Sequence, residues 1–308
     1  MTQWPVISSD FSAYRENPEL CAVEIPVGTC SADTIVVFGQ DGYLFVHTGA
    51  NNINGQYLMP QDEAQALAAQ WAETLDRRRE TAKAAGVQFL QMIVPEKSSL
   101  LPQKTPFPAA AGTPLMQALS ASQASHPDYI DVRVLFDADE ALIAFPKANG
   151  HMSAFGSVKA FQAALARLGL EPPTITFGPP QIKRSDLSDH FGGLQFYNRV
   201  AFPNSPEIET YSAGLQEILV IEDAGHRGQR RGWSNPSAPI KKRVLAFGNS
   251  FFERGGSPEC LSWWFARWFE EFQFIWSPDL DPAEIEAYKP DIVICQTIER
   301  FLPQVQGR

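Results

Sequence analysis

Segments typical of helices and of buried strands alternate along this chain, and this alternation limits the folds that it can adopt. Residues 61–85 carry apolar side chains at helical spacing and are followed by Gly86. Residues 87–94 then read as a buried strand that Pro95 ends. A helix followed at once by a strand is half of a β–α–β unit, and such units build parallel sheets. We therefore predict an α/β fold in three layers, with a mostly parallel sheet flanked by helices.

The alternation of expected helices and strands continues over the rest of the chain. We expect a hairpin of strands 34–39 and 43–46, because the Asp41–Gly42 pair favours a tight turn. Further elements are expected as helices at 114–123, 158–168 and 258–272 and as strands at 132–136, 142–145, 243–247 and 291–296. Residues 171–240 are rich in Pro, Gly and Asn and are expected to form loops and short strands over the core. Residues 1–33 read as an irregular N-terminal extension, and 34–308 as a single domain.

Charge argues against one class of partner. The 308 residues carry a formal net charge of −10, whereas binding to nucleic-acid phosphates needs clustered cations. The basic runs at 227–231 and 241–243 are best explained as a solvated loop that leads into a strand. We therefore expect no nucleic acid as a partner.

The chain carries no segment typical of export or of a membrane span. Its first residues lack a basic head followed by an apolar run, and no stretch approaches the roughly 20 apolar residues of a spanning helix. As written, the sequence predicts a cytoplasmic protein. Four cysteines are present; Cys295 belongs to an apolar run, and Cys21 and Cys30 could form a bridge in an oxidising compartment.

One strand ends in a turn that could carry chemistry. The apolar run 244–247 leads directly into Gly248, Asn249 and Ser250. Open α/β sheets place their sites where strands end, and a serine there can act as a nucleophile if a base and free backbone N–H groups are close. A serine can also simply cap such a turn, and the turn alone favours capping.

His151 is the histidine that we would pair with this serine. It lies between the expected strand 142–145 and the expected helix 158–168, in a loop at the same kind of sheet edge as Ser250. A lone loop histidine seldom acts as a base, so its neighbourhood decides. The other histidines have weaker contexts; they are His47, His126, His190 and His226.

Several short sequence motifs support a function for the neighbourhood of His151, because they occur together and in a fixed order. They are residues 39–45, 93–98, 149–156, 247–251 and 290–294 with 299–302. Together they resemble the alginate O-acetyltransferase (AlgJ/AlgX-type) branch of the SGNH hydrolase superfamily, over most of the chain from about residue 38 to 303. In this branch the histidine phrase precedes the serine phrase, and the chain follows that order.

The resemblance implies an SGNH-type fold and a double displacement. Ser250 would take an acyl group, usually acetyl, from a donor, with His151 as general base, and a sugar hydroxyl or water would then remove it. The residues expected to form the oxyanion and substrate pocket are Gly248, Asn249, Phe251 and Arg254.

Two positions depart from the family pattern. Asn149 stands where the family has the acidic partner of the histidine, and Met152 replaces a tryptophan. An amide can orient an imidazole but cannot stabilise its cation with a charge. The precedent for replacing Asp with Asn in a catalytic triad is a loss of about 10⁴ in rate. Either another carboxylate reaches His151, or activity is low or lost. The candidate carboxylates, which the sequence does not rank, are Asp137, Asp139 and Asp186.

Three functions therefore follow from the resemblance. The first is O-acetylation of a carbohydrate in polysaccharide or glycoconjugate biosynthesis, with no bound cofactor or metal, an acyl donor such as acetyl-CoA or a donor protein, and a possible biosynthetic partner enzyme. The second is a carbohydrate O-acetyl esterase that uses the same residues. The third is a catalytically silent protein that binds a glycan or a partner, because of Asn149. The resemblance also implies a periplasmic location if a leader was removed.

Overall fold

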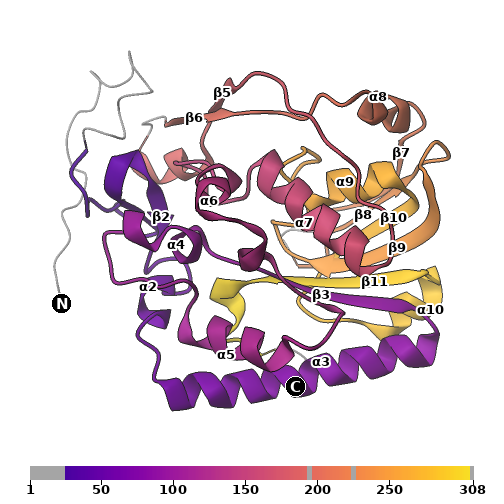
Figure 1. The fold of residues 1–308 in the computed structure, drawn as a ribbon, viewed down its shortest axis with the longest axis horizontal. Helices are drawn as coiled ribbons and strands as arrows, with labels where there is room; N and C mark the ends of the chain where they lie inside the picture. Colours follow the sequence, from indigo (N-terminus) through magenta and orange to yellow (C-terminus); the bar gives the residue numbers. More distant parts are fainter. Residues whose placement is uncertain (1–24, 193–195, 223–226, 306–308) are drawn as a thin grey trace.

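A seven-stranded sheet forms the centre of the structure, a computed structural model that describes residues 25–192, 196–222 and 227–305 (Figure 1). The strands lie in the order β4 (Tyr129–Asp131), β3 (Gln88–Val94), β11 (Ile292–Ile298), β9 (Ile240–Gly248), β10 (Phe269–Trp276), β8 (Arg230–Ser234) and β7 (Gln216–Ile221). The strands from β4 to β10 are parallel, whereas β8 and β7 join antiparallel. The predicted three-layer α/β fold with a mostly parallel sheet is confirmed.

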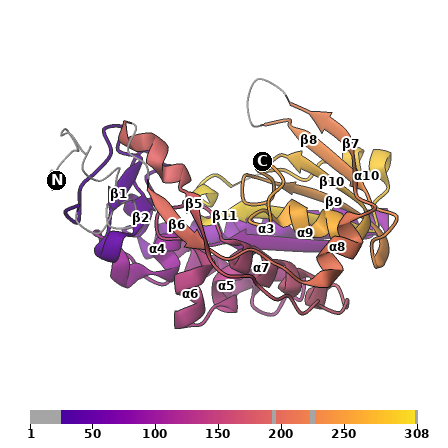
Figure 2. The same ribbon diagram turned by 90° about the horizontal axis from the view of Figure 1, so that it is seen from above.

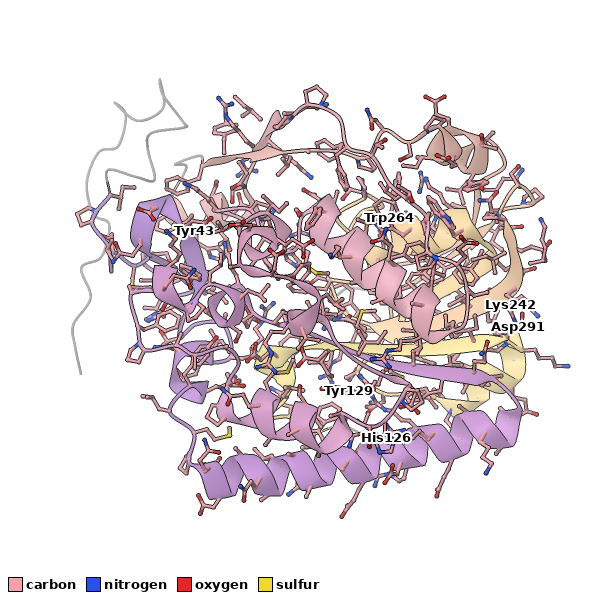
Figure 3. The ribbon with its side chains drawn as sticks, viewed as in Figure 1. Tyr43, His126, Tyr129, Lys242, Trp264 and Asp291 are labelled. Carbon is pink, nitrogen blue, oxygen red and sulfur yellow. The ribbon has the colours of Figure 1, made fainter. Side chains whose placement is uncertain are left out.

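Helices cover both faces of this sheet, because its strands present apolar side chains to either side. One face meets α7 (Ala154–Arg167) and α9 (Leu261–Trp268), and the other meets α3 (Gln61–Ala85), α5 (Pro114–Gln123) and α10 (Pro282–Tyr288). Successive residues of β9 alternate in this way: Ala246 packs with the α7 and α9 side, and Leu245 with the α10 side. Figure 3 shows Trp264 on the side of α7 and Tyr129 on the side of α3.

The long helix α3 matches the range that the sequence predicts. Its apolar stripe includes Trp71 and Leu75, which are fully buried. The indole N–H of Trp71 donates a hydrogen bond to the carbonyl oxygen of Leu302 at 2.7 Å. The helix is followed by Gly86, whose φ of 70° is readily adopted by glycine. The hydrogen bond between Trp71 and Leu302 fixes the chain just beyond β11 onto α3.

Smaller elements lie around one end of the central sheet. They are the hairpin β1 (Val36–Phe38) and β2 (Leu44–Val46), the hairpin β5 (Gln181–Arg184) and β6 (Tyr197–Val200), and the helices α2 (Ile53–Gln56), α4 (Lys97–Leu100) and α6 (Ala138–Ala144). The short helix α8 (Pro206–Ser212) lies near the other end, beside α9. Figure 2 shows β1 and β2 at the end of the molecule remote from β7 and β8. The expected β1–β2 hairpin is therefore present, with its turn at 40–42 and Asp41 at a φ of 54°.

Several expected elements differ from the structure. The strand expected at 142–145 is part of α6, because the Asp137 side chain caps the backbone N–H groups of Asp139 and Glu140 and starts a helix there. The strand expected at 132–136 is a 3₁₀ helix (Val132–Leu135) that follows β4.

The aromatic segment after residue 258 was expected to be one helix to 272, but it divides. Helix α9 ends at Trp268 and the strand β10 begins at Phe269. The aromatic residues of this segment fit helical spacing. As a strand, however, β10 forms backbone hydrogen bonds with β9 on one side and with β8 on the other. Within 171–240, β7 and β8 extend the central sheet, so part of this region belongs to the core layer.

The expected N-terminal extension is described only from residue 25 onward. The thiol of Cys30 is free and buried, and the backbone of this residue forms an isolated β-bridge with that of Val37. Cys21 lies outside the described residues. Among the described residues, no helix combines the length and apolar character needed to cross a membrane.

Candidate active site

The serine turn begins where β9 ends. The Oδ1 atom of Asn249 accepts a hydrogen bond from the N–H of Phe251 at 3.1 Å, and its carbonyl oxygen accepts from the N–H of Phe252 at 2.8 Å. From β11, Gln296 Oε1 accepts the N–H of Asn249 at 3.1 Å. These bonds hold Ser250 at the tip of the turn. The next helix, α9, begins only at Leu261, so the turn itself presents the serine.

Gly248 allows this close approach of β11. A Cβ atom at this position would lie 2.8 Å from Gln296 Oε1 and 3.2 Å from the Cβ of Phe252. Both neighbouring side chains are buried, so the Gln296 side chain would have to leave its bond to the Asn249 backbone.

Gly248→Ala should therefore lower the free energy of unfolding by about 1–3 kcal/mol, the usual cost of overpacking a well-packed interior. Gly178→Ala is the matched control, because the nearest atom to its added Cβ would be 3.7 Å away. Denaturant unfolding of both variants would measure the difference, and equal stabilities would show that the turn has room to adjust.

The histidine lies in the turn between α6 and α7. The Lys97 ammonium donates to the carbonyl oxygens of Pro146, Lys147 and Asn149 at 3.0, 2.8 and 2.7 Å, which ties this turn to α4. The Oδ1 atom of Asn149 accepts the backbone N–H of His151 at 2.8 Å. These bonds fix the backbone that carries the imidazole.

Three side chains form one hydrogen-bonded chain at the end of the sheet. His151 Nε2 lies 2.9 Å from Ser250 Oγ, and His151 Nδ1 lies 2.8 Å from Asp186 Oδ2. Asp186 starts the 3₁₀ helix Asp186–Phe191 after β5. Because a carboxylate only accepts, Nδ1 carries the proton and Nε2 is left to accept from the serine hydroxyl. The arrangement can therefore remove the proton from Ser250.

The carboxylate of Asp186 is itself held from two further sides. Its Oδ1 atom accepts the N–H of Gly150, and its Oδ2 atom accepts from Arg254 Nη1, both at 2.9 Å. The sequence offered Asp186 only as one of three candidates. Of the other two, Asp137 caps α6 and Asp139 lies in the first turn of that helix.

Asn149 does not take the position expected for it. The oxygen beside the imidazole belongs to Asp186, whereas the Asn149 amide faces the backbone of His151, since a side chain two residues earlier can fold back onto that N–H. Phe251 also differs from expectation: it is buried beneath the imidazole, with ring centroids 4.6 Å apart, and does not face the cleft.

Burial and charge set the protonation of the pair. Burial lowers the pKa of His151, and the cations of Arg254 and Arg300 lower it further, while Asp186 acts in the opposite direction. For Asp186, burial would raise the pKa, but the hydrogen bond from His151 and the nearby positive charges hold it well below the usual range. At neutral pH the site therefore holds a neutral base beside an ionised carboxylate.

A cleft of about 520 Å³ opens over the serine. Its walls include His151, Ser250 and Arg254, together with Gly248 and Asn249. Within the described residues, the N–H of Ser250 has no hydrogen-bond acceptor, so it is available to a bound substrate oxygen. A second cavity of about 550 Å³ lies between α6 and the β5–β6 hairpin, but Ser250, His151 and Asp186 do not line it. The described residues contain no group of three or more His, Cys, Asp or Glu side chains that could hold a metal ion.

The mostly parallel sheet, with a serine, a histidine and an aspartate joined at its edge, defines an α/β protein of the SGNH hydrolase type. A family model described as the SGNH hydrolase-like domain of the acetyltransferase AlgX matches residues 36–195, about half of the chain, and the chain belongs to this family. The family resemblance predicted from the sequence is confirmed. Comparison with curated protein sequences finds no match.

Solved structures support the same fold. The structure of Bacillus cereus PatB1 with a sulfonyl adduct is 12% identical, covers 88% of this chain and 97% of its own, and has a TM-score of 0.61. A second PatB1 structure covers 77% of this chain and 91% of its own, with 12% identity and a TM-score of 0.55. A DHHW family protein from Eubacterium siraeum is 11% identical, with coverages of 89% and 96% and a TM-score of 0.54. At such identities the likeness concerns the fold alone.

Proposed function

We propose that this protein transfers an acetyl group to a carbohydrate hydroxyl through an acyl-Ser250 intermediate. One observation carries the proposal: the hydrogen-bond chain from Asp186 through His151 to Ser250, with distances of 2.8 and 2.9 Å. The acetyltransferase description of the family supports acetyl as the acyl group. Asp186 also supplies the negative charge whose expected absence had suggested a catalytically silent protein.

Acylation of the serine would begin with proton transfer. His151 Nε2 takes the hydroxyl proton as Ser250 Oγ bonds to the carbonyl carbon of the donor. The negative charge that develops on the carbonyl oxygen is stabilised by the N–H of Ser250. The tetrahedral intermediate then collapses, the bond to the leaving group breaks, and His151 gives its proton to that group. Throughout, Asp186 stabilises the imidazolium.

Transfer would repeat these steps in reverse order. A carbohydrate hydroxyl gives its proton to His151 and attacks the acyl carbonyl, and the proton returns to Ser250 Oγ as the ester bond to the enzyme breaks. Water in the same position would hydrolyse the intermediate instead. An esterase would therefore use the same three side chains, and the acceptor decides the outcome.

Trapping the intermediate tests this proposal. After incubation with p-nitrophenyl acetate, peptide mass spectrometry should find the acetyl group on Ser250, and added oligosaccharide should remove it as acetylated sugar. Ser250→Ala should carry no adduct in this segment, whereas the nearby control Ser257→Ala should be acetylated normally. An adduct that persists in Ser250→Ala, or a wild-type protein that is never acetylated, would refute the mechanism.

The expected pH dependence of kcat/KM follows from the pKa of the general base, His151. Burial lowers the pKa of His151 below 6.5, and only neutral imidazole can accept the serine proton. We therefore expect kcat/KM for p-nitrophenyl acetate to be close to its plateau at pH 7 and to fall only at lower pH. A pH–rate profile whose acid limb is centred above 6.5 would contradict this assignment of the base.

A further inference from the structure

The cavity of about 550 Å³ between α6 and the β5–β6 hairpin has mainly apolar walls, and we call it the apolar cavity. Phe155 and Phe177 line it together with Leu142, Ile143 and Ile182. The last three side chains are 38%, 55% and 58% exposed, whereas most large apolar side chains of the described residues are buried. Exposed apolar side chains that gather around one hollow are typical of a site that takes an apolar ligand.

Hydrogen bonds hold the walls of the apolar cavity in place. Ser153 Oγ donates to the carbonyl oxygen of Ile143 at 2.6 Å, which joins the start of α7 to α6 on one side of the cavity. The N–H of Ala148 donates to Asn198 Oδ1 of β6 at 2.8 Å, which joins the two sides. The cavity is therefore formed by the fold itself, as small-molecule sites usually are.

Positive charge lies at the apolar cavity. Lys147 and Arg199 line it, and none of the described residues that line it is Asp or Glu. The Lys147 ammonium donates to the backbone carbonyl oxygen of Asp41 at 3.0 Å, and the Asp41 carboxylate pairs with Lys104. Arg199 of β6 lies directly opposite Ile182 of β5, so its charge adjoins the apolar wall. Because the whole chain carries a net charge of −10, this local excess of cations favours an anionic group at this place.

We propose that the apolar cavity binds a fatty acid, with the aliphatic chain along the apolar walls and the carboxylate at Lys147 and Arg199. The chemistry of the walls selects this class of ligand. A sugar would leave the apolar side chains uncovered, and an amphiphile with a positive head group would be repelled by the two cations. The volume lies within the range of small-molecule sites. Because Ser250 does not line this cavity, the proposal does not depend on acetyl transfer.

Isothermal titration calorimetry with octanoate and dodecanoate tests the role of the chain, at concentrations below those at which the soaps form micelles. Each further buried methylene group should tighten binding about fourfold, so dodecanoate should bind roughly a hundredfold more tightly than octanoate. Dodecanol and dodecylammonium test the head group. Dodecanoate should bind about tenfold more tightly than either, because hydrogen bonds to a charged group are strong. An affinity that does not depend on chain length, or dodecylammonium that binds as tightly as dodecanoate, would overturn the proposal.

Two matched variants locate the binding site. Ile182→Asp and Ile218→Asp each replace an isoleucine of a strand, 58% and 60% exposed respectively, but Ile218 belongs to β7 and does not line the apolar cavity. The first variant should weaken dodecanoate binding at least about tenfold, since it places a carboxylate beside the chain of the ligand. The second should bind as the wild type does. Equal affinities in the two variants would show that the fatty acid binds elsewhere.

A third variant, Lys147→Gln/Arg199→Gln, separates the head group from the chain and keeps the test valid should Ile182→Asp fail to fold. Circular dichroism would verify the folding of each variant. The double variant should bind dodecanoate and dodecanol about equally, while the difference between octanoate and dodecanoate should remain. A preference for dodecanoate over dodecanol that survives the loss of both cations would refute the assignment of Lys147 and Arg199.

Discussion

Asp186→Asn should lower kcat/KM for an activated acetyl ester by about 10⁴, the loss known for the same change in a serine–histidine–aspartate triad. The asparagine could still contact the ring, but its N–H₂ group could face Nδ1 and favour the wrong tautomer of His151. It would also carry no charge to stabilise the imidazolium that forms as Ser250 is activated. The change should not unfold the protein, because Asp186 is partly exposed and the two side chains are nearly equal in size.

Asn149→Ala is the informative comparison. Its amide only accepts the backbone N–H of His151, so its loss should cost about one hydrogen bond, or roughly tenfold in kcat/KM. Steady-state kinetics of both variants, with circular dichroism to verify folding, would rank the two residues. If Asn149→Ala were the more damaging change, the assignment of Asp186 as the partner of the imidazole would be wrong.

Lys97→Met should destabilise the fold by about 3–5 kcal/mol, a typical cost of removing one member of a buried charged group. The ammonium is buried and makes three hydrogen bonds to the backbone of the turn that carries His151. Methionine can fill the space but leaves those carbonyl oxygens without donors, and it removes one of the two cations near the buried Glu96, which then keeps only its pair with Arg300. Denaturant unfolding followed by tryptophan fluorescence would measure the change. Lys104→Met, which removes a surface pair with Asp41, should have a much smaller effect.

The same lysine makes a prediction about pH. Burial lowers the pKa of Lys97 to about 7, below its value of 10.5 when exposed. Between these values the unfolded chain binds more protons than the native protein, so this group makes stability rise with pH. From pH 7 to pH 9, the free energy of unfolding of the wild type should rise relative to that of Lys97→Met by up to about 1.4 kcal/mol per pH unit. A difference that is constant over this range would show that Lys97 keeps an ordinary pKa.

The parts of the fold that could be predicted are those in which local pattern and tertiary environment agree. Residues 61–85 have one apolar stripe and bury it, and β3 and β11 have apolar side chains on both faces because helices cover both. The strand β10 was missed because its pairing with β9 and β8 outweighs a sequence that also fits a helix. The helix α6 was missed because its cap at Asp137 lies outside the apolar run on which the strand prediction relied.

The site was predictable in part for a similar reason. Ser250 and His151 each sit in a short phrase with its own local signal, and the structure brings them to 2.9 Å. Asp186 has no such signal, because its role depends on a contact with a residue 35 positions earlier. The N–H of Gly150 also donates to this carboxylate in the structure, but a glycine in a loop gives no sequence signal for such a contact.

The separation of these residues along the chain also bears on how activity appears during synthesis. His151 lies 35 positions before Asp186 and 99 positions before Ser250, and β9, which ends beside that serine, lies between β11 and β10, both of which follow it in the sequence. Contacts so distant in sequence form late, because closing long loops is entropically costly. A nascent chain still on the ribosome would have no working centre until β11 has emerged, so ester turnover would report completed folding of the whole sheet.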